Sequence, residues 1–219
     1  MLKEKSFNSC TLDFLDEQFG LEQVTETLPH LKKWLEASKT EFISERQQEQ
    51  LQSLQDLLQF NVDSWNEQEL DMHFIGPLFN MINFSSTKFN LFAQRTVSGI
   101  VKDWKLFGAP DGLIASGRRV PKIPFFAFAE YKRQINPKGH PAAQALSAML
   151  VGQSFNENAN TPIYGSYVIG QDWYFMTLEG NQYSRTHDYS AITSDLDDIF
   201  CILLNLKKIV QKRTEQIAS

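Results

Sequence analysis

The sequence predicts an α/β fold, in which a central mixed sheet of about five strands is flanked by helices and preceded by an N-terminal helical extension. Three observations lead to this fold class. Leucines recur at helical spacing through residues 1–62, segments rich in β-branched and aromatic residues follow between residues 88 and 178, and helical periodicity returns at 141–156 and 193–216. The order of helices and strands predicts two regions, a helical extension over 1–62 and a main domain over 63–219.

The first element of the main domain is a helix over residues 63–84. Asp63 and Ser64 can cap its N-terminus, and apolar residues follow one of its faces. Gly76 and Pro77 predict a bend near its middle, because proline donates no backbone hydrogen bond.

Five segments then alternate or run apolar as strands do. They cover residues 89–97, 113–115, 124–132, 164–169 and 173–178. Gly170 and Gln171 separate the last two and predict a two-residue hairpin.

Composition excludes several classes of protein. The 219 residues carry a net charge of −5, which excludes a globally basic nucleic-acid binder but not a local basic surface. Two distant cysteines make neither a disulfide framework nor a zinc cluster. The apolar runs are too short for a bilayer, and the N-terminal residues lack the apolar core of a signal peptide. We therefore expect a cytoplasmic protein without membrane contact.

The strongest chemical signal lies at the end of the segment 124–132. Glu130 and Lys132 are two residues apart, so on a strand they share one face, which upstream carries Phe126 and Phe128. Charges on such a face require a partner or a metal ion. Asp111, at the start of an adjacent short strand, can bring a second carboxylate to the same point.

Two carboxylates and a backbone carbonyl suit a hard divalent cation. We expect Mg²⁺ at Asp111 and Glu130, with Mn²⁺ as a substitute. Lys132 can then orient a water molecule or stabilise charge on a phosphate.

Pro110-Asp111-Gly112 followed by Glu130-Tyr131-Lys132 resembles the motif of the PD-(D/E)xK nuclease superfamily. Residues 65–78 are similar to the helix that precedes the core in the nuclease domain of type I restriction enzyme R subunits. The resemblance covers residues 63–180 and implies a restriction-endonuclease-like core within 63–219. It also implies a metal-dependent nuclease that hydrolyses phosphodiester bonds in nucleic acid, with DNA favoured over RNA.

The resemblance also implies two further site residues. A glutamate on the preceding helix helps hold the metal in such relatives, and Glu67 matches it best, with Glu69 as the second choice. Gln144 lies on the helix after the motif, where many relatives carry a glutamine that faces the site.

Six basic residues and one acid lie between Ser116 and His140, which is a local cationic region in an acidic chain. This favours contact with a nucleic-acid backbone. The residues expected to bind nucleic acid are Arg118, Arg119, Lys122, Arg133 and Lys138. A solvated loop is the alternative interpretation.

Other interpretations stay open at this point. Pro110-Asp111-Gly112 can be a simple β-turn, Glu130 and Lys132 can be an ion pair at a sheet edge, and Asp103-Trp104-Lys105 also fits the acidic-x-Lys pattern. A catalytically inactive nuclease fold that binds nucleic acid or a protein partner is the alternative function. The N-terminal helices could dock such a partner or a second copy of the chain.

Overall fold

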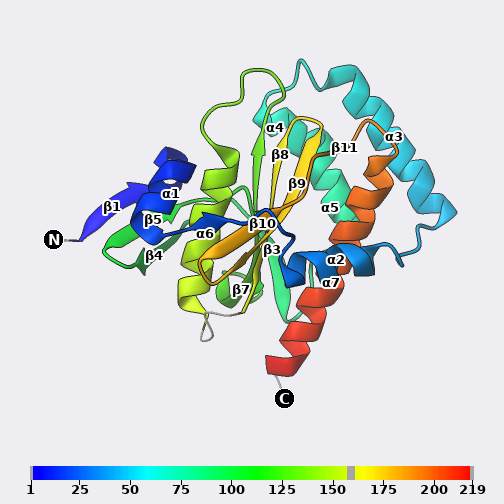
Figure 1. Cartoon of the computed structure of the whole chain (residues 1–219). Helices are drawn as coiled ribbons and strands as arrows, with labels where there is room; N and C mark the ends of the chain where they lie inside the picture. Colours follow the sequence, from blue (N-terminus) through cyan, green and yellow to red (C-terminus); the bar gives the residue numbers. More distant parts are fainter. Residues whose placement is uncertain (1, 157–160, 218–219) are drawn as a thin grey trace.

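A mixed sheet of eight strands forms the centre of the protein (Figure 1). The computed structural model describes residues 2–156 and 161–217. Seven strands lie in the order β2-β10-β9-β8-β7-β6-β3, and β11 pairs with β9. The strands are β2 (Glu22–Gln23), β3 (Phe89–Ala93), β6 (Gly112–Ser116), β7 (Lys122–Lys132), β8 (Ile163–Ile169), β9 (Asp172–Glu179), β10 (Gln182–Arg185) and β11 (Tyr189–Ser190).

The middle of this sheet combines antiparallel and parallel pairing. β7 is antiparallel to β6 and parallel to β8. A parallel pair needs a crossover, and helix α6 (Pro141–Phe155) provides it. β8 and β9 form the predicted hairpin, with Gly170 at φ 56° in the turn. β7 is therefore the strand around which the rest of the sheet is arranged.

A second sheet of three strands lies beside the first. β4 (Val97–Val101) and β5 (Trp104–Gly108) are antiparallel, and β1 (Lys3–Ser6) pairs in parallel with β5. The short 3₁₀ helix η1 (Phe7–Ser9) follows β1. The N-terminal residues are thereby attached to a hairpin formed about a hundred residues later in the chain.

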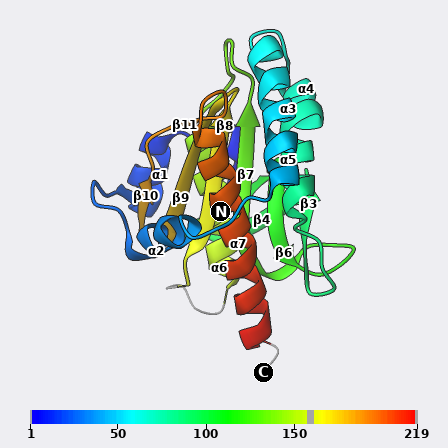
Figure 2. The ribbon, with the colours of Figure 1, turned by 90° about the vertical axis from the view of Figure 1, so that its right-hand side faces the viewer.

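Helices cover both faces of the large sheet (Figures 1 and 2). α1 and α6 pack on one face, and α2, α3, α5 and α7 pack on the other. Within the described residues, none of the helices combines the length and apolar character that crossing a bilayer requires. The remaining bounds are α1 (Leu12–Phe19), α2 (Pro29–Ser38), α3 (Glu45–Asn61), α4 (Glu67–Leu70), the π-helix η2 (Asp71–Ile75), α5 (Gly76–Ile82) and α7 (Asp195–Ile217).

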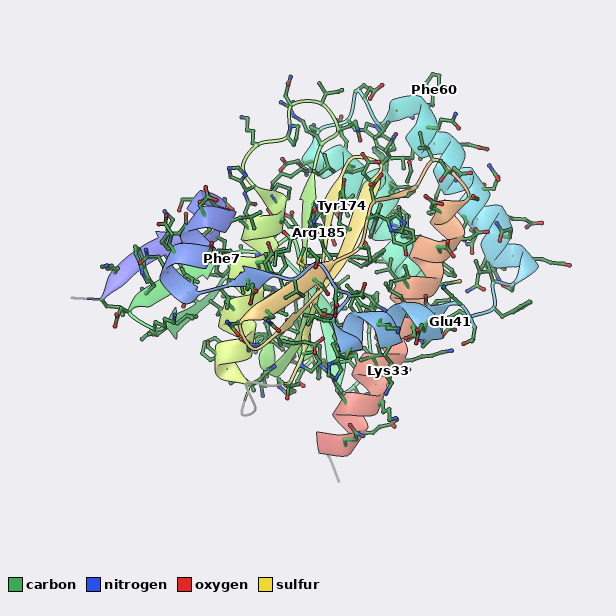
Figure 3. The ribbon with its side chains drawn as sticks, viewed as in Figure 1. Phe7, Lys33, Glu41, Phe60, Tyr174 and Arg185 are labelled. Atoms are coloured by element: carbon green, nitrogen blue, oxygen red, sulfur yellow. The ribbon has the colours of Figure 1, made fainter. Side chains whose placement is uncertain are left out.

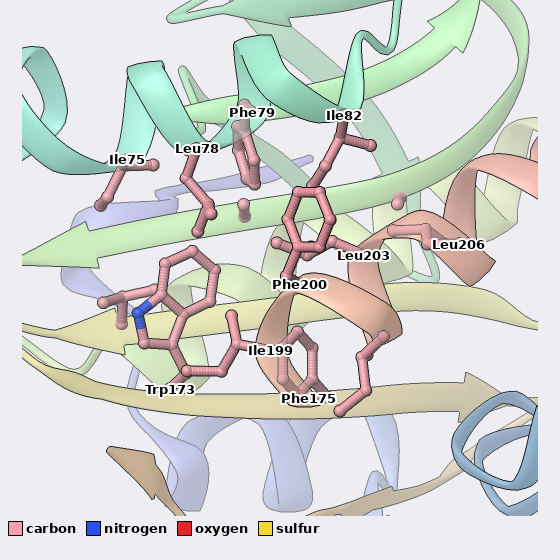
Figure 4. Close-up of a cluster of buried hydrophobic side chains, with 14 of the residues drawn as sticks. Ile75, Leu78, Phe79, Ile82, Trp173, Phe175, Ile199, Phe200, Leu203 and Leu206 are labelled. Atoms are coloured by element: carbon pink, nitrogen blue, oxygen red, sulfur yellow. The ribbon is translucent and has the colours of Figure 1, made fainter. Parts of the chain in front are cut away.

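The core between the large sheet and α7 is built from large side chains of β9, α5 and α7 (Figure 4). Trp173 and Phe175 rise from β9 and pack between Leu78 of α5 and Ile199 and Phe200 of α7. All five side chains are fully buried. This packing fixes α5, and with it the helical segment that reaches the candidate site.

The expectation of about five strands was wrong, since the large sheet has eight. The five predicted segments correspond to β3, β6, β7, β8 and β9. β2, β10 and β11 have only two to four residues, and such lengths are too short to show a period in the sequence. Backbone pairing adds them to the sheet beyond β8.

The sequence predicted a helical extension over residues 1–62, but these residues are not wholly helical. They contain α1, α2 and α3, but also β1 and β2, whose side chains are largely exposed and leave no apolar pattern. Trp34 of α2 is buried and donates its indole N–H to the carbonyl oxygen of Ile202 at 2.8 Å. These residues contribute to the main core, while the domain boundary after residue 62 stays a prediction.

We expect Trp34→Ala to lower the free energy of unfolding by about 3–5 kcal/mol, because it leaves a cavity beneath α7. Phe60→Ala is the matched control, since Phe60 lies in the same N-terminal region and its side chain is 90% exposed. Denaturant unfolding of both variants measures the difference. Equal stabilities would contradict the assignment of the N-terminal helices to the main core.

Candidate active site

The C-terminal end of β7 carries two buried charges. Glu130 and Lys132 are 6% and 7% exposed, and they share the face of Phe128, which packs against α6. Phe126 lies in the core on the opposite face, contrary to the expected alternation. A bulge where β7 pairs with β6 explains the difference, because it adds one residue and reverses the faces upstream.

Asp111 reaches the same end of the sheet from β6. Gly112 pairs with Ala129 and Asp111 directly precedes Gly112, so Asp111 lies beside the end of β7, close enough to Glu130 to raise its pKa. The Asp111 Oδ2 atom accepts the backbone N–H of Tyr131 at 2.7 Å. Pro110-Asp111-Gly112 is thus more than a turn, because its carboxylate is bonded to the strand that carries the second half of the motif.

Gly112 permits this close approach. A Cβ atom at that position would lie 2.9 Å from the Tyr131 hydroxyl and 3.2 Å from the Ala129 side chain. Both distances are shorter than packed atoms tolerate, so a larger residue would push β6 and Asp111 away from β7.

Lys132 connects the carboxylates of the strand and of the preceding helix. Its Nζ atom lies 2.7 Å from Glu130 Oε1 and 3.9 Å from Glu67 Oε2. Glu69, the second choice from the sequence, is used otherwise: its carboxylate accepts the N–H of Asn66 at 2.8 Å in a capping box. The geometry therefore favours Glu67 over Glu69 at the site.

The proximity of the acids alters their protonation. Burial, and then the neighbouring Asp111, raise the pKa of Glu130 to about 7, although Lys132 opposes this. Burial also raises the pKa of Asp111, against its hydrogen bond from Tyr131. Burial disfavours the charged Lys132, but Glu130 and the other carboxylates outweigh it, so the pKa of Lys132 is raised. Lys132 is therefore an ammonium at neutral pH.

The sequence analysis missed Asp71. Desolvation raises its pKa, and the Asp111 carboxylate raises it further, so the two acids are close. Asp71 begins the π-helix η2, in which the Gly76 N–H bonds the Asp71 carbonyl five residues back. Pro77, which donates no hydrogen bond, follows directly and explains the wider turn. The four-residue spacing from Glu67 could have revealed Asp71, because it places both on one helix face.

Two adjoining clefts open beside these residues. The first, of about 450 Å³, is lined by Glu67, Asp71, Gln94, Asp111 and Tyr131 among others. The second, of about 280 Å³, shares Asp71, Asp111 and Tyr131 and continues along α5. Asp71 and Asp111 therefore border both clefts and Glu67 borders the first, whereas Glu130 and Lys132 line neither.

Gln144 is buried on α6, on the sheet face that Glu130 and Lys132 share. Its side-chain nitrogen packs against Gly139 in the preceding loop. In the residues that the structure describes, its side-chain oxygen has no hydrogen-bond partner. Gln144 thus retains an acceptor near the motif, but no bond joins it to Asp111, Glu130 or Lys132 in the described structure.

The five predicted nucleic-acid contacts do not lie together. Arg118, Arg119 and Lys122 occupy the β6–β7 hairpin, and ten residues of β7 place Lys122 about 33 Å from Lys132. Arg133 and Lys138 lie in the loop that directly follows Lys132. Arg133 and Lys138 therefore lie nearer to Glu130 than the hairpin residues do, and the role of all five stays a prediction.

The donor set fits a hard divalent cation. Glu130, Glu67 and Asp111 lie near the Lys132 ammonium, and Asp71 lies near Asp111. In residues 2–156 and 161–217, no three His, Cys, Asp or Glu side chains form a closed metal cluster. Mg²⁺ needs none, since it is commonly bound by one or two carboxylates, water and substrate phosphate.

No protein-family model matches the chain, and a search of the curated proteins finds no relative.

We expect the Glu130 carboxyl to titrate near pH 7 in metal-free protein, and Asp111→Asn to lower that pKa by removing a neighbouring negative charge. The folded state keeps this proton while the unfolded chain releases it near pH 4.5. The free energy of unfolding therefore falls, by on the order of 3 kcal/mol from this group, as the pH rises from 4.5 to 7.

Carbon-13 NMR of labelled glutamate measures the titration directly, and unfolding at several pH values measures the slope. Glu130→Gln should remove this contribution to the slope, whereas Asp103→Asn, in the β4–β5 turn, should leave both readouts unchanged. A Glu130 carboxyl that titrates near 4.5 would contradict the account of the site.

Proposed function

We propose that the protein is a Mg²⁺-dependent nuclease that hydrolyses phosphodiester bonds in nucleic acid, with DNA as the favoured substrate. One observation carries the proposal: the Asp111 carboxylate accepts the backbone N–H of Tyr131, between Glu130 and Lys132, and the Lys132 Nζ atom lies 2.7 Å from Glu130. This arrangement agrees with the PD-(D/E)xK resemblance of the motif. If the matches to the motif were accidental, these side chains would have no reason to lie together in the folded chain.

The topology around the motif supports a restriction-endonuclease-like core. The motif occupies the antiparallel pair β6–β7, the crossover helix α6 follows, and β8 returns in parallel beside β7. In an open α/β sheet, ligands bind beyond the strand ends. Asp111 and Lys132 lie at such an end, next to the clefts beside α4 and α5.

Each residue has a role in this proposal. Asp111 and Glu130 would hold the metal, with Mn²⁺ as a substitute for Mg²⁺ and Glu67 as an auxiliary ligand. The bound ion supplies Lewis acidity toward the scissile phosphate and lowers the pKa of an attacking water. Gln144 would orient groups at the site through its unbonded oxygen.

Lys132 acts as a donor rather than as a base. Its raised pKa keeps it charged at neutral pH, so its N–H groups can position water and stabilise charge on the phosphate. In the structure it neutralises part of the carboxylate charge through Glu130. Lys132 therefore also keeps the acidic residues together before a cation binds.

The carboxylates of the site favour a nuclease over a catalytically inactive binding module with the same fold. A binding module has no need for two neighbouring buried carboxylates, which repel a phosphate backbone in the absence of a cation. Arg133 and Lys138, in contrast, suit either function, as do the N-terminal helices as a docking surface for a protein partner.

We expect the purified protein to cleave DNA when Mg²⁺ or Mn²⁺ is added, and Asp111→Asn, Glu130→Gln and Lys132→Met each to lower the rate at least about a hundredfold. The reason is the loss of a metal ligand in the first two variants and of a charged donor in the third. Gel-based cleavage of single- and double-stranded substrates measures the rates.

The chain offers a matched control in the second acidic-x-Lys sequence. Asp103→Asn and Lys105→Met should cleave at the wild-type rate, because Lys105 is bonded to Glu4 on the exposed second sheet. Cleavage retained in both Asp111→Asn and Lys132→Met would refute the proposed site. DNA binding without cleavage by the wild type would favour the inactive module.

A further inference from the structure

A separate cavity of about 500 Å³ opens between α2 and α7. Figure 3 labels Lys33 on α2, close to α7. The lining includes four cationic side chains and two aromatic ones: Lys33, Lys208, Lys212, Arg213, Trp34 and Tyr164. Tyr164 pairs with Ala127, five residues before Lys132, which places it about 16 Å along the sheet from the candidate active site.

Arg213 is the most informative of these residues. Burial lowers the pKa of its guanidinium, which lies 5.0 Å from the centroid of the Tyr164 ring. Its Nη1 atom donates to the carbonyl oxygen of Pro162 at 2.9 Å. Arg213 is partly buried, and a charge withdrawn from water is normally paired with an opposite charge. In residues 2–156 and 161–217, Arg213 has no carboxylate within ion-pair distance.

The lysines divide into one neutralised and two uncompensated side chains. Lys208 lies 2.6 Å from Glu41, which also accepts from Asn205 at 3.2 Å. Lys33 and Lys212 have no such partner in the described part of the chain. Among the described residues, three cations around this cavity thus have no carboxylate partner, in a chain whose net charge is −5.

We propose that this cavity binds a phosphate-bearing small molecule of about nucleotide size. The guanidinium of Arg213 has further N–H donors, and phosphate oxygens can accept two of them side by side. Lys33 and Lys212 add charge from opposite walls. A volume of 500 Å³ exceeds the need of a lone phosphate and lies in the range of small-molecule sites.

The proposal does not depend on the nuclease assignment. None of the residues that line the cavity belongs to the candidate active site, and the ligand differs from a nucleic-acid substrate in being a single small molecule. Isothermal titration with pyrophosphate and with adenosine triphosphate tests it. EDTA in the buffer prevents a divalent cation from joining these probes to Asp111.

We expect the wild type and Asp111→Ala to bind at least one of the two probes equally well. The double variant Lys33→Ala/Lys212→Ala should bind at least tenfold more weakly, and it should fold, because both side chains are exposed. Arg213→Lys should also weaken binding, since it keeps the charge and loses the planar fork. Lys32→Ala is the matched control, because Lys32 neighbours Lys33 on α2 and faces Glu36.

Two results would overturn the proposal. One is the absence of binding of both probes to the wild type, including the case in which only a DNA oligonucleotide binds. The other is undiminished binding by the double variant, which would place the probe elsewhere.

Discussion

The arrangement of the candidate site depends on an electrostatic imbalance at the end of β7. Asp111 and Glu130 lie close together at the end of β7, Glu67 and Asp71 approach from the helix, and Lys132 is the ammonium bonded to Glu130. Each buried acid raises the proton affinity of its neighbour, and one lysine offsets only part of that cost. Such a cluster is expensive for folding. A divalent cation would supply the missing positive charge. Binding of such a cation would explain why the fold keeps a cluster of acids that lowers its stability.

Local irregularities in the backbone bring these side chains together. The bulge in β7 turns Phe126 to one core and leaves Phe128, Glu130 and Lys132 on the face of α6. The π-helix before Pro77 widens the helix at Asp71, which borders the clefts beside Asp111. Both features lie next to the charged residues, and irregularities of this kind are frequent at functional sites. The rigid packing of α5 against β9 and α7 then holds the helix in place (Figure 4).

The sequence predicted the parts of the protein whose signals are local. The long strands β7, β8 and β9, the crossover helix α6 and the pairing of Asp111 with Glu130 and Lys132 follow from periodicity and motif spacing. The short strands β1, β2 and β11 could not be predicted, because backbone pairing with distant segments creates them. β10 forms a hairpin with β9, but its four residues are too few to show a period. The reversed face of Phe126 required knowledge of the bulge. The distance between Lys122 and Lys132 follows from the length of β7, which separates basic residues that are close in sequence.

Calorimetric titration of the metal-free protein with Mn²⁺ tests the central claim most directly, because it needs no knowledge of the substrate. The account predicts saturable binding by the wild type, accompanied by proton release near pH 6.5 as Glu130 loses its proton, and its loss in Asp111→Ala. Circular dichroism of Asp111→Ala would verify that the variant is folded. Absence of binding to the wild type, or equal binding by the two proteins, would contradict the claim that the neighbouring carboxylates form a metal site.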